Sequence, residues 1–289
     1  MRTRQISKQS LSKTLSEPWV DTTRRVYCEG DTAYVPVKEG SSFDTEIPDR
    51  VPYSGPGYQR MGDTLLLHGA APTEEQLASL IAWENPSCIL HTTTHEGVMR
   101  IPKTVVLYGT PHEVSFREAG ISYTLDPSKV MFSQGNRGEK LRLRSLVLPG
   151  ERIADMFAGI GYFTLSAALA GGNVHAMEIN PVSFAYLTKN IRDNGLMERI
   201  TPELGDCREK LSGVYDRILM GHFDAPDFLE EALRHAGPGT ILHVHGIGDR
   251  EPDISGTLAG AGFTYIISEH KVKKYSGKLR HSVWDVKLL

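Results

Sequence analysis

The chain has 289 residues, a formal net charge of −3, and 40% hydrophobic against 23% charged residues. These values indicate a globular protein of one large domain or two modest ones, and the overall charge does not by itself indicate a nucleic-acid partner. No apolar run reaches the ~18 residues of a membrane-spanning helix, and the N-terminus lacks the apolar segment of a secretory signal. Three scattered cysteines fit neither a disulfide framework nor a zinc site, so we expect a reducing cytoplasm and no metal.

The first half of the chain predicts mixed, short elements. Residues 1–58 are polar and rich in turn-forming residues, and their role is left open. Residues 61–69 predict a strand, and 73–83 predict a helix with a threonine N-cap. Residues 112–126 predict a β-hairpin because apolar and polar residues alternate on both sides of a glycine turn. Together, residues 59–130 predict a small α+β domain.

Strands and helices alternate regularly in the second half of the chain, from about residue 150. Apolar strands such as 152–158, 173–179 and 240–247 are separated by helical segments, one of which begins with Pro181 and stops at a glycine. This alternation predicts an α/β fold with a doubly wound, mostly parallel sheet, and we assign it to residues 131–289.

A glycine-containing loop follows the first strand of that sheet. Asp155 stands at the strand end, and Gly159 and Gly161 allow the backbone to approach a ligand. A dinucleotide loop usually has a third glycine three residues later, where this chain has Thr164, and no Gly-Lys-Ser/Thr end of a phosphate loop is present. A carboxylate at 155 would repel phosphate but attract a sulfonium or ammonium group.

Two further acids follow the next two strands. Glu178 lies 23 residues after Asp155, where it can accept hydrogen bonds from both ribose hydroxyls. Asp206 ends the third strand, where it can accept from an adenine amino group beside the backbone of Cys207. A ligand with ribose and adenine but no phosphate fits these positions, and S-adenosylmethionine fits best. The alternative is a glycine turn that packs a helix on a strand, with acids that only cap loops.

Several separated motifs resemble one family. "DMFAGIGYFTL", "AMEINPVSFAYLTKNIRDNG", "GDCRE" and "YDRILMG" are similar to the class I S-adenosylmethionine enzymes that modify the purine beside the tRNA anticodon, and upstream and C-terminal segments match over roughly residues 55–289. The resemblance implies a Rossmann-like class I catalytic domain with a smaller N-terminal α+β domain, and tRNA as partner, with the anticodon arm of tRNA-Phe as the expected target.

The family has two branches, and the fourth strand distinguishes them. The tRNA (guanine-N1)-methyltransferase branch ends this strand with an Asn-Pro type motif, whereas here Gly221 and His222 stand in that place. The segment "KVMFSQGNRGEK" and the short 1–58 segment also favour the other branch, the wybutosine-synthesis aminocarboxypropyltransferases. The guanine-N1 methyltransferase remains an alternative, as does a catalytically silent module that only docks tRNA.

The resemblance also implies cofactor contacts, and these fall on Ser133, Lys140, Glu178, Asp206 and Cys207. Lys140 or Arg137 could pair with the methionine carboxylate, to which Ser133 could donate a hydrogen bond. For Lys140 the alternative is an ordinary surface residue at the start of a helix.

Aminocarboxypropyl transfer requires the γ-carbon of the cofactor to face the acceptor, and its leaving group is methylthioadenosine. The resemblance implies that the acceptor is a ring carbon, C7 of the tricyclic 4-demethylwyosine base, from which a proton would leave after attack. His222 and Asp224 are the candidates to take that proton or to orient the base, unless they are ordinary loop residues. Tyr162, Phe163 and Phe223 could stack on the base or belong to the core.

Basic residues gather in two segments, 137–144 and 270–281. We expect Arg137, Lys271, Lys273 and Lys274 to contact tRNA phosphates, with the 59–130 domain positioning the anticodon arm. The alternative for each segment is a solvated protein face.

Overall fold

The computed structural model describes residues 1–48 and 53–289, so residues 49–52 of the predicted 1–58 segment lie outside the described residues. The chain forms two compact units: one contains Met1–Gly55 and Thr73–Asn85, and the other contains Pro56–Pro72 and Pro86–Leu289. The boundaries that we predicted at residues 58 and 130 do not coincide with these units. As functional domains, 1–58, 59–130 and 131–289 remain predictions.

The first unit contains a four-stranded sheet in the order β2-β3-β1-β4 and the helix α2. Its elements are β1 (Arg2–Ser7), a 3-10 turn (Lys8–Ser10), α1 (Leu11–Thr14), β2 (Tyr27–Glu29), β3 (Thr32–Pro36), β4 (Thr45–Glu46) and α2 (Glu74–Glu84). The predicted helix at 73–83 is confirmed, since Thr73 and Gln76 form a reciprocal capping box at its start.

The second unit begins with a four-stranded sheet in the order β5-β6-β7-β8, followed by the hairpin β9–β10. The strands are β5 (Tyr58–Met61), β6 (Thr64–His68), β7 (Cys88–Glu96), β8 (Ile101–Gly109), β9 (Val114–Glu118) and β10 (Ile121–Leu125). The strand predicted at 61–69 is confirmed as β6, but it begins later than predicted, because Met61 ends β5 and a turn at Gly62, with φ of +58°, joins the two paired strands. The predicted hairpin is confirmed, with Ala119 and Gly120 both at positive φ in its two-residue turn.

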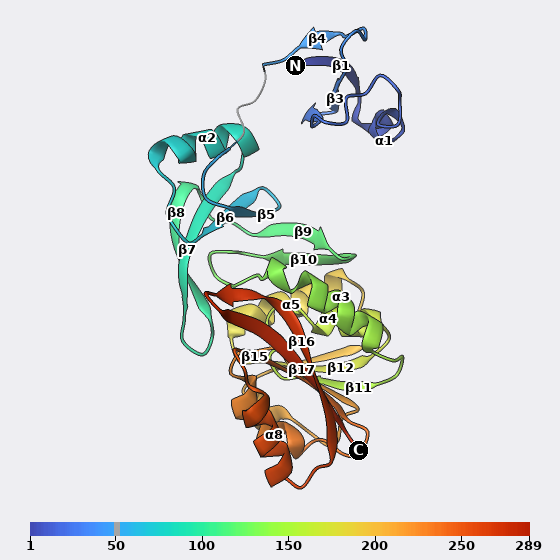
Figure 1. Cartoon of the computed structure of the whole chain (residues 1–289), viewed down its shortest axis with the longest axis vertical. Helices are drawn as coiled ribbons and strands as arrows, with labels where there is room; N and C mark the ends of the chain where they lie inside the picture. Colours follow the sequence, from blue (N-terminus) through green and yellow to red (C-terminus); the bar gives the residue numbers. More distant parts are fainter. Residues whose placement is uncertain (49–52) are drawn as a thin grey trace. The chain divides into compact units, whose positions relative to one another are not determined.

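A seven-stranded sheet forms the rest of this unit, in the order β13-β12-β11-β14-β15-β17-β16 (Figure 1). Its strands are β11 (Arg152–Asp155), β12 (Asn173–Glu178), β13 (Ile200–Leu204), β14 (Arg217–Met220), β15 (Ile241–Ile247), β16 (Tyr265–Ser276) and β17 (Leu279–Leu288). Only β17 runs antiparallel to its neighbours, β15 and β16. The predicted doubly wound α/β sheet is therefore confirmed.

Helices cover both faces of this sheet, and the alternation of its strand residues explains why. Ile153 and Leu219 point to one buried cluster, while their neighbours Ala154 and Ile218 point to the other. The helices are a 3-10 turn (Gln134–Asn136), α3 (Arg137–Leu146), α4 (Thr164–Leu169), α5 (Pro181–Asp193), α6 (Cys207–Lys210), a 3-10 turn (Ala225–Phe228), α7 (Leu229–Leu233) and α8 (Glu251–Gly260). Helices α3, α4 and α5 contribute to the first cluster, and α7 and α8 to the second. Among the described residues, no helix combines the length and apolarity needed to cross a membrane.

Candidate functional site

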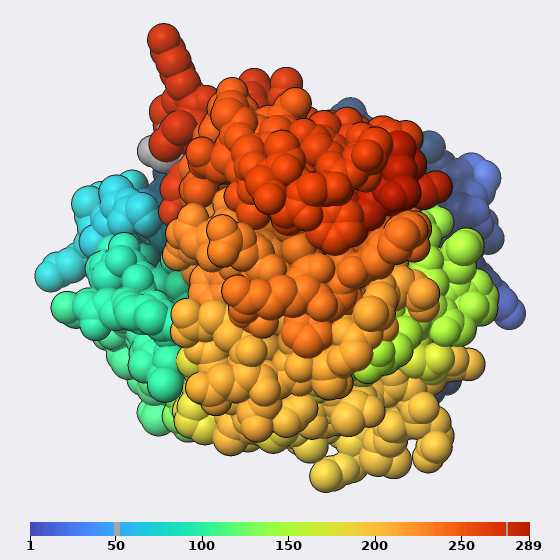
Figure 2. Space-filling view, turned by 90° about the horizontal axis from the view of Figure 1, so that it is seen from below, coloured from blue at the N-terminus to red at the C-terminus, as the bar shows by residue number. Residues whose placement is uncertain are grey.

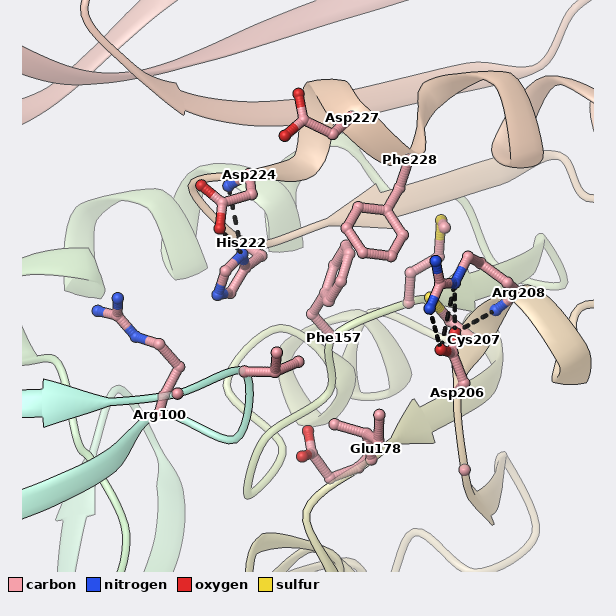
Figure 3. Close-up of a pocket in the computed structure, with 15 residues that line it drawn as sticks. Arg100, Phe157, Glu178, Asp206, Cys207, Arg208, His222, Asp224, Asp227 and Phe228 are labelled. Carbon is pink, nitrogen blue, oxygen red and sulfur yellow. Dashed lines mark hydrogen bonds and ion pairs between the residues drawn. The ribbon is translucent and has the colours of Figure 1, made fainter.

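The carboxyl ends of the parallel strands meet at one edge of the seven-stranded sheet, and a cavity of about 640 Å³ opens there (Figure 3). Its lining comes from the loops after β11 to β14 and from the turn between β7 and β8: Gly97, Val98, Arg100, Met156, Phe157, Glu178, Ile179, Gly205, Asp206, Cys207, Arg208, His222, Asp224, Asp227 and Phe228. A smaller cavity of about 110 Å³ shares Glu178 and His222 with it and extends to Ser133, Gly159 and Tyr162. We call these the larger and the smaller cavity.

Glu178 lines both cavities from the end of β12. Its two carboxylate oxygens accept hydrogen bonds from the backbone N–H groups of Gly159 and Asn180, both at 2.7 Å. Burial raises the pKa of Glu178, and the two backbone donors act against that rise. Each oxygen keeps a second lone pair, so the carboxylate can also accept hydroxyl donors from a ligand.

Asp206 and Cys207 line the larger cavity from the loop after β13, across from His222, and Asp206 caps α6 by accepting from the Arg208 N–H at 2.9 Å (Figure 3). The side-chain hydrogen bond from Arg208 lowers the pKa of Asp206, so this carboxylate is ionised at neutral pH. The Cys207 side chain is buried, and burial raises the pKa of its thiol to about 12. Phe157 and Phe228 meet edge to face between this acid and His222, and they provide an apolar wall.

His222 lies in the wall that the two cavities share, just after β14. Its Nδ1 accepts a hydrogen bond from the Asp224 N–H at 3.2 Å, so the neutral ring carries its proton on Nε2. This Nε2 is buried and has no hydrogen-bond partner among the described residues. Burial lowers the pKa of His222, so the ring is neutral at pH 7 and presents an N–H donor. Asp224 lines the larger cavity with an exposed carboxylate.

Asp155 and Gly161 do not face either cavity, contrary to our expectation. The Asp155 side chain is 0% exposed and accepts hydrogen bonds from Thr164 Oγ1 at 2.7 Å and from the Phe157 N–H at 3.3 Å. Its carboxylate therefore braces the glycine loop instead of meeting a ligand charge. Gly161, at φ of +103°, leaves room for Leu165, because a Cβ there would come within 2.9 Å of that side chain.

Gly159 and Ser133 do lie at the smaller cavity, as predicted. At Gly159 the space of a Cβ is taken by the ring of Tyr162, and the backbone has φ of +57°. Tyr162 contributes its ring to the cavity and donates its hydroxyl hydrogen to the carbonyl oxygen of Met131. Phe163 also lines this cavity, although it is largely buried.

Lys140 is neither a surface residue nor a free cation at the cavity. Its side chain is 1% exposed, and Nζ donates to Glu118 Oε1 at 2.6 Å. The rings of Tyr123, Phe132 and Tyr162 surround the ammonium at 4.4–5.6 Å from their centroids. Burial lowers the pKa of Lys140, and Glu118 acts against that fall. The Glu118 carboxylate thus occupies the position in which we expected a ligand carboxylate.

The other predicted basic residues lie in different places. Arg137 is exposed and lines a separate hollow with Glu118 and Gln134. Lys271 and Lys274 are exposed on β16, whereas Lys273 turns inward and donates to Ser133 Oγ at 2.9 Å. Within the described ranges no three His, Cys, Asp or Glu side chains gather in a way that could hold a metal ion.

Our sequence analysis did not predict that the β7–β8 turn lines the site. Arg100, at φ of +52°, extends over the ring of Phe223 at 5.6 Å from its centroid, and Asn180 Nδ2 donates to the Met99 carbonyl at 3.2 Å. In Figure 2 the blue-green surface near residue 100 borders the yellow and orange surface of the seven-stranded domain. The sequence does show a glycine-containing turn between two strands rich in β-branched residues. Nothing in that turn indicates contact with Glu178 and Asp206, which follow about 80 to 110 residues later.

The strand order, the single reversed strand and the acids at the strand ends define the fold of class I S-adenosylmethionine-dependent transferases. The model of the TRM5/TYW2 methyltransferase domain matches residues 114–257. The tRNA(Phe) (4-demethylwyosine(37)-C(7)) aminocarboxypropyltransferase of Pyrococcus horikoshii is 32% identical over 244 residues, which cover 79% of this chain and 88% of that protein. The chain belongs to the TRM5/TYW2 family.

Solved structures of both branches share the fold. The structure of P. horikoshii TYW2 in complex with MeSAdo matches with a TM-score of 0.71 at 29% identity. The match covers 82% of this chain and 92% of the P. horikoshii chain. The structure of the Methanocaldococcus jannaschii tRNA m1G37 methyltransferase matches with a TM-score of 0.69 at 22% identity. That match covers 100% of this chain and 99% of the methyltransferase chain. The N-terminal residues thus have a fold counterpart in the methyltransferase, and our argument that the 1–58 segment is too short for that branch is wrong.

Proposed function

We propose that the chain transfers the 3-amino-3-carboxypropyl group of S-adenosylmethionine to C7 of 4-demethylwyosine in tRNA-Phe. The observation that carries this proposal is the end of β14, where Gly221 and His222 replace the Asn-Pro motif of the guanine-N1 methyltransferases. The 32% identity to an aminocarboxypropyltransferase over most of both chains supports the same branch. A cytoplasmic location is part of the proposal, since tRNA is the substrate.

The environment of Gly221 supports the choice of branch on steric grounds. A Cβ at this position would lie 2.9 Å from two ring atoms of Phe163, which is closer than real side chains pack. An asparagine at 221 would therefore require Phe163 to move. The ring of Phe163 in turn contacts His245, with 5.0 Å between the ring centroids, so its position is fixed from behind.

The residues around the larger cavity fit S-adenosylmethionine. Glu178 can accept from the ribose hydroxyls, Asp206 from the adenine amino group, and the Phe157 ring can pack on the adenine. Ser133 and the backbone of Gly159 in the smaller cavity can face the methionine end. When bound, the cofactor supplies a sulfonium-activated γ-carbon, and methylthioadenosine is the leaving nucleoside.

We assign His222 to orienting the base and not to proton removal. Its ring is neutral and its unpaired Nε2–H is a donor, so it can hold an acceptor atom of the target base near the smaller cavity. Transfer would form a bond between the γ-carbon and C7 and break the bond between the γ-carbon and sulfur, whose electrons stay on the sulfur. C7 would then lose a proton. Asp224 has an exposed carboxylate beside His222 and is the candidate acceptor for that proton.

The tRNA would reach this site past the β7–β8 turn. Val98 and Met99 are exposed there, at 77% and 43%, and Arg100 has no carboxylate within 4.0 Å among the described residues. Exposed apolar groups beside an unpaired guanidinium suit the bases and phosphates of a single-stranded loop. Lys271 and Lys274 provide further phosphate contacts on β16.

A double-label transfer assay tests the proposal. The chain is incubated with tRNA-Phe that carries 4-demethylwyosine and with S-adenosylmethionine labelled either in the methyl group or in the aminocarboxypropyl arm. We expect only the arm label to enter the tRNA. Methyl label in the tRNA, particularly with unmodified guanosine 37 as substrate, would establish the methyltransferase alternative. Cofactor and tRNA binding without any transfer would establish the silent docking module.

A further inference from the structure

Lys273 differs from the basic residues around it. Lys271 and Lys274 are exposed, while Lys273 is half-buried. The β16–β17 pairing has an irregularity between Lys271 and Lys273, where the register opposite β17 shifts by one residue. Such bulges re-aim a side chain, and here the bulge turns one lysine of the segment inward. A set of phosphate contacts on an exposed strand would not need this irregularity.

The inward-turned side chain ends at Ser133, a residue of the smaller cavity, and Lys273 itself stands behind that lining. Its Nζ donates to Ser133 Oγ at 2.9 Å, and Ser133 lines that cavity together with Gly159, Tyr162 and Glu178. The chain of Lys273 lies across Gly135, where a Cβ would come within 2.8 Å of its Cδ and Nζ. The glycine at 135 thus makes the path of the lysine possible. Two segments about 140 residues apart build one positively charged corner.

The charge of this corner is not balanced. Lys140, the neighbouring buried ammonium, has Glu118 as its partner, but no carboxylate lies within 4.0 Å of Lys273 Nζ in the described residues. Burial lowers the pKa of Lys273, and the charge of Lys140 lowers it further. His281 adds no negative charge, since burial and Lys273 lower its pKa to about 4 and leave the ring neutral. A half-buried cation without an anion is costly to maintain, so the corner lacks one negative charge.

We propose that Lys273, together with Ser133, binds the carboxylate of the 3-amino-3-carboxypropyl arm of S-adenosylmethionine. The inference rests on the proposed function for the identity of the ligand, and it reassigns Lys273 from tRNA phosphates to the cofactor. A carboxylate is small enough for the 110 Å³ cavity, and Glu178 in the same wall fixes where the ribose of that ligand begins. An ammonium that holds the far end of the arm determines the direction in which the γ-carbon faces.

The test compares two nucleosides that differ by the arm. We expect Lys273→Met to weaken S-adenosylmethionine binding about 10- to 100-fold by calorimetry, since a charge-assisted hydrogen bond is lost. Binding of methylthioadenosine, which has no carboxylate, should change less than about twofold. Ser133→Ala should show the same selectivity to a smaller extent. Lys274→Met, one residue along β16, is the matched control and should leave the affinity for both nucleosides unchanged.

Three results would overturn the assignment. Equal loss for both nucleosides in Lys273→Met would mean a general disturbance of the pocket, and no loss for either would mean no contact. A loss confined to tRNA affinity, with a flatter salt dependence, would return Lys273 to the phosphate contacts. If Lys273→Met does not fold, Ser133→Ala provides the test, by the same comparison of its loss of affinity for S-adenosylmethionine with its loss for methylthioadenosine. The readout is binding and does not depend on which carbon is transferred, so a methyl-transfer result in the label assay would refute the proposed function and leave this contact standing.

Discussion

The carboxylates of Glu178 and Asp155 have different roles because their surroundings differ. Glu178 and Asp155 end neighbouring strands, and burial raises the pKa of both. Glu178 receives backbone N–H donors and faces the cavities, whereas Asp155 is enclosed by Thr164 and the loop that begins at Phe157. The first can act on a ligand, and the second acts on the shape of the loop.

Substitution of Glu178 tests its role toward the ribose. We expect Glu178→Gln to weaken S-adenosylmethionine binding by about 1.5–3 kcal/mol, because hydrogen bonds to an ionised acceptor are lost. The thermal midpoint should fall as well, since the amide oxygen can accept only one of the two backbone N–H groups and the other is left without an acceptor. Calorimetry measures the affinity, and a value equal to that of the unsubstituted chain would refute the ribose assignment.

The stability of the chain should depend on pH through Asp155. Its pKa is raised to about 6 in the fold, mainly by burial, against an ordinary value of 3.8. Because the pKa of Asp155 is higher in the folded chain than in the unfolded chain, the protonated carboxyl stabilises the folded state fully at pH values below the unfolded-state pKa. This stabilisation is lost as pH rises from about 4 to about 6. We expect the unfolding free energy, relative to that of Asp155→Asn, to fall by about 3 kcal/mol over this window. Urea titrations at several pH values measure the difference, and parallel curves for the two proteins would contradict the prediction.

At the scale of elements, the β7–β8 hairpin connects the upstream sheet to the site. Arg100 at its tip should contribute one phosphate contact, so Arg100→Gln should weaken tRNA binding and reduce the slope of log affinity against log salt by about 1. Lys103→Gln is the control on the same hairpin, since Lys103 is 65% exposed and paired with Glu96. Cofactor affinity should not change in either variant. Identical salt slopes for the two variants would remove Arg100 from the tRNA contacts.

A buried polar network connects α3 to the centre of the sheet. Arg142 bonds Glu139 and Asp285, and His243 links Asp285 to Arg217. Although burial acts to raise it, hydrogen bonds from His243 and Arg142 hold the pKa of Asp285 well below its usual range. The network fixes α3, which carries Lys140 behind the smaller cavity.

Removal of one partner of this network should destabilise the fold. We expect Asp285→Ala to cost about 3 kcal/mol of unfolding free energy, because the half-buried guanidinium of Arg142 and the ring of His243 lose their acceptor. Asp253→Ala on α8 is the control, since Asp253 is 61% exposed beside Arg250 and should cost less than about 0.5 kcal/mol. Equal urea midpoints for the two variants would contradict this account.

For the whole molecule, the sequence predicted the features that depend on local patterns. Strand and helix alternation predicted the sheet, and the spacing of Glu178 and Asp206 placed both at one edge. Lys140 could not be placed, because its partner Glu118 and its three aromatic neighbours come from three separate segments: the β9–β10 hairpin, the stretch before α3 and the loop after β11. Asp155 was misjudged because Thr164 was considered only as a missing glycine, although its hydroxyl is the group that holds the carboxylate.

The arrangement of segments distant in sequence was also beyond local patterns. The helix α2 belongs to the unit of residues 1–55 and not to the segments that flank it, which no local pattern indicates. The β7–β8 turn and the bulge in β16 reach the site only through tertiary pairing. The β7–β8 turn adds Arg100 to the site, and the bulge in β16 turns Lys273 inward, so both features alter which residues we assign to the site.

The leaving nucleoside tests the central claim most directly. The chain, S-adenosylmethionine and tRNA-Phe bearing 4-demethylwyosine are incubated, and the nucleosides released are separated and identified by mass. Aminocarboxypropyl transfer predicts methylthioadenosine in an amount equal to the modified base, and a tRNA mass increase that corresponds to the arm. Release of S-adenosylhomocysteine with a tRNA mass increase of one methyl group would contradict the account.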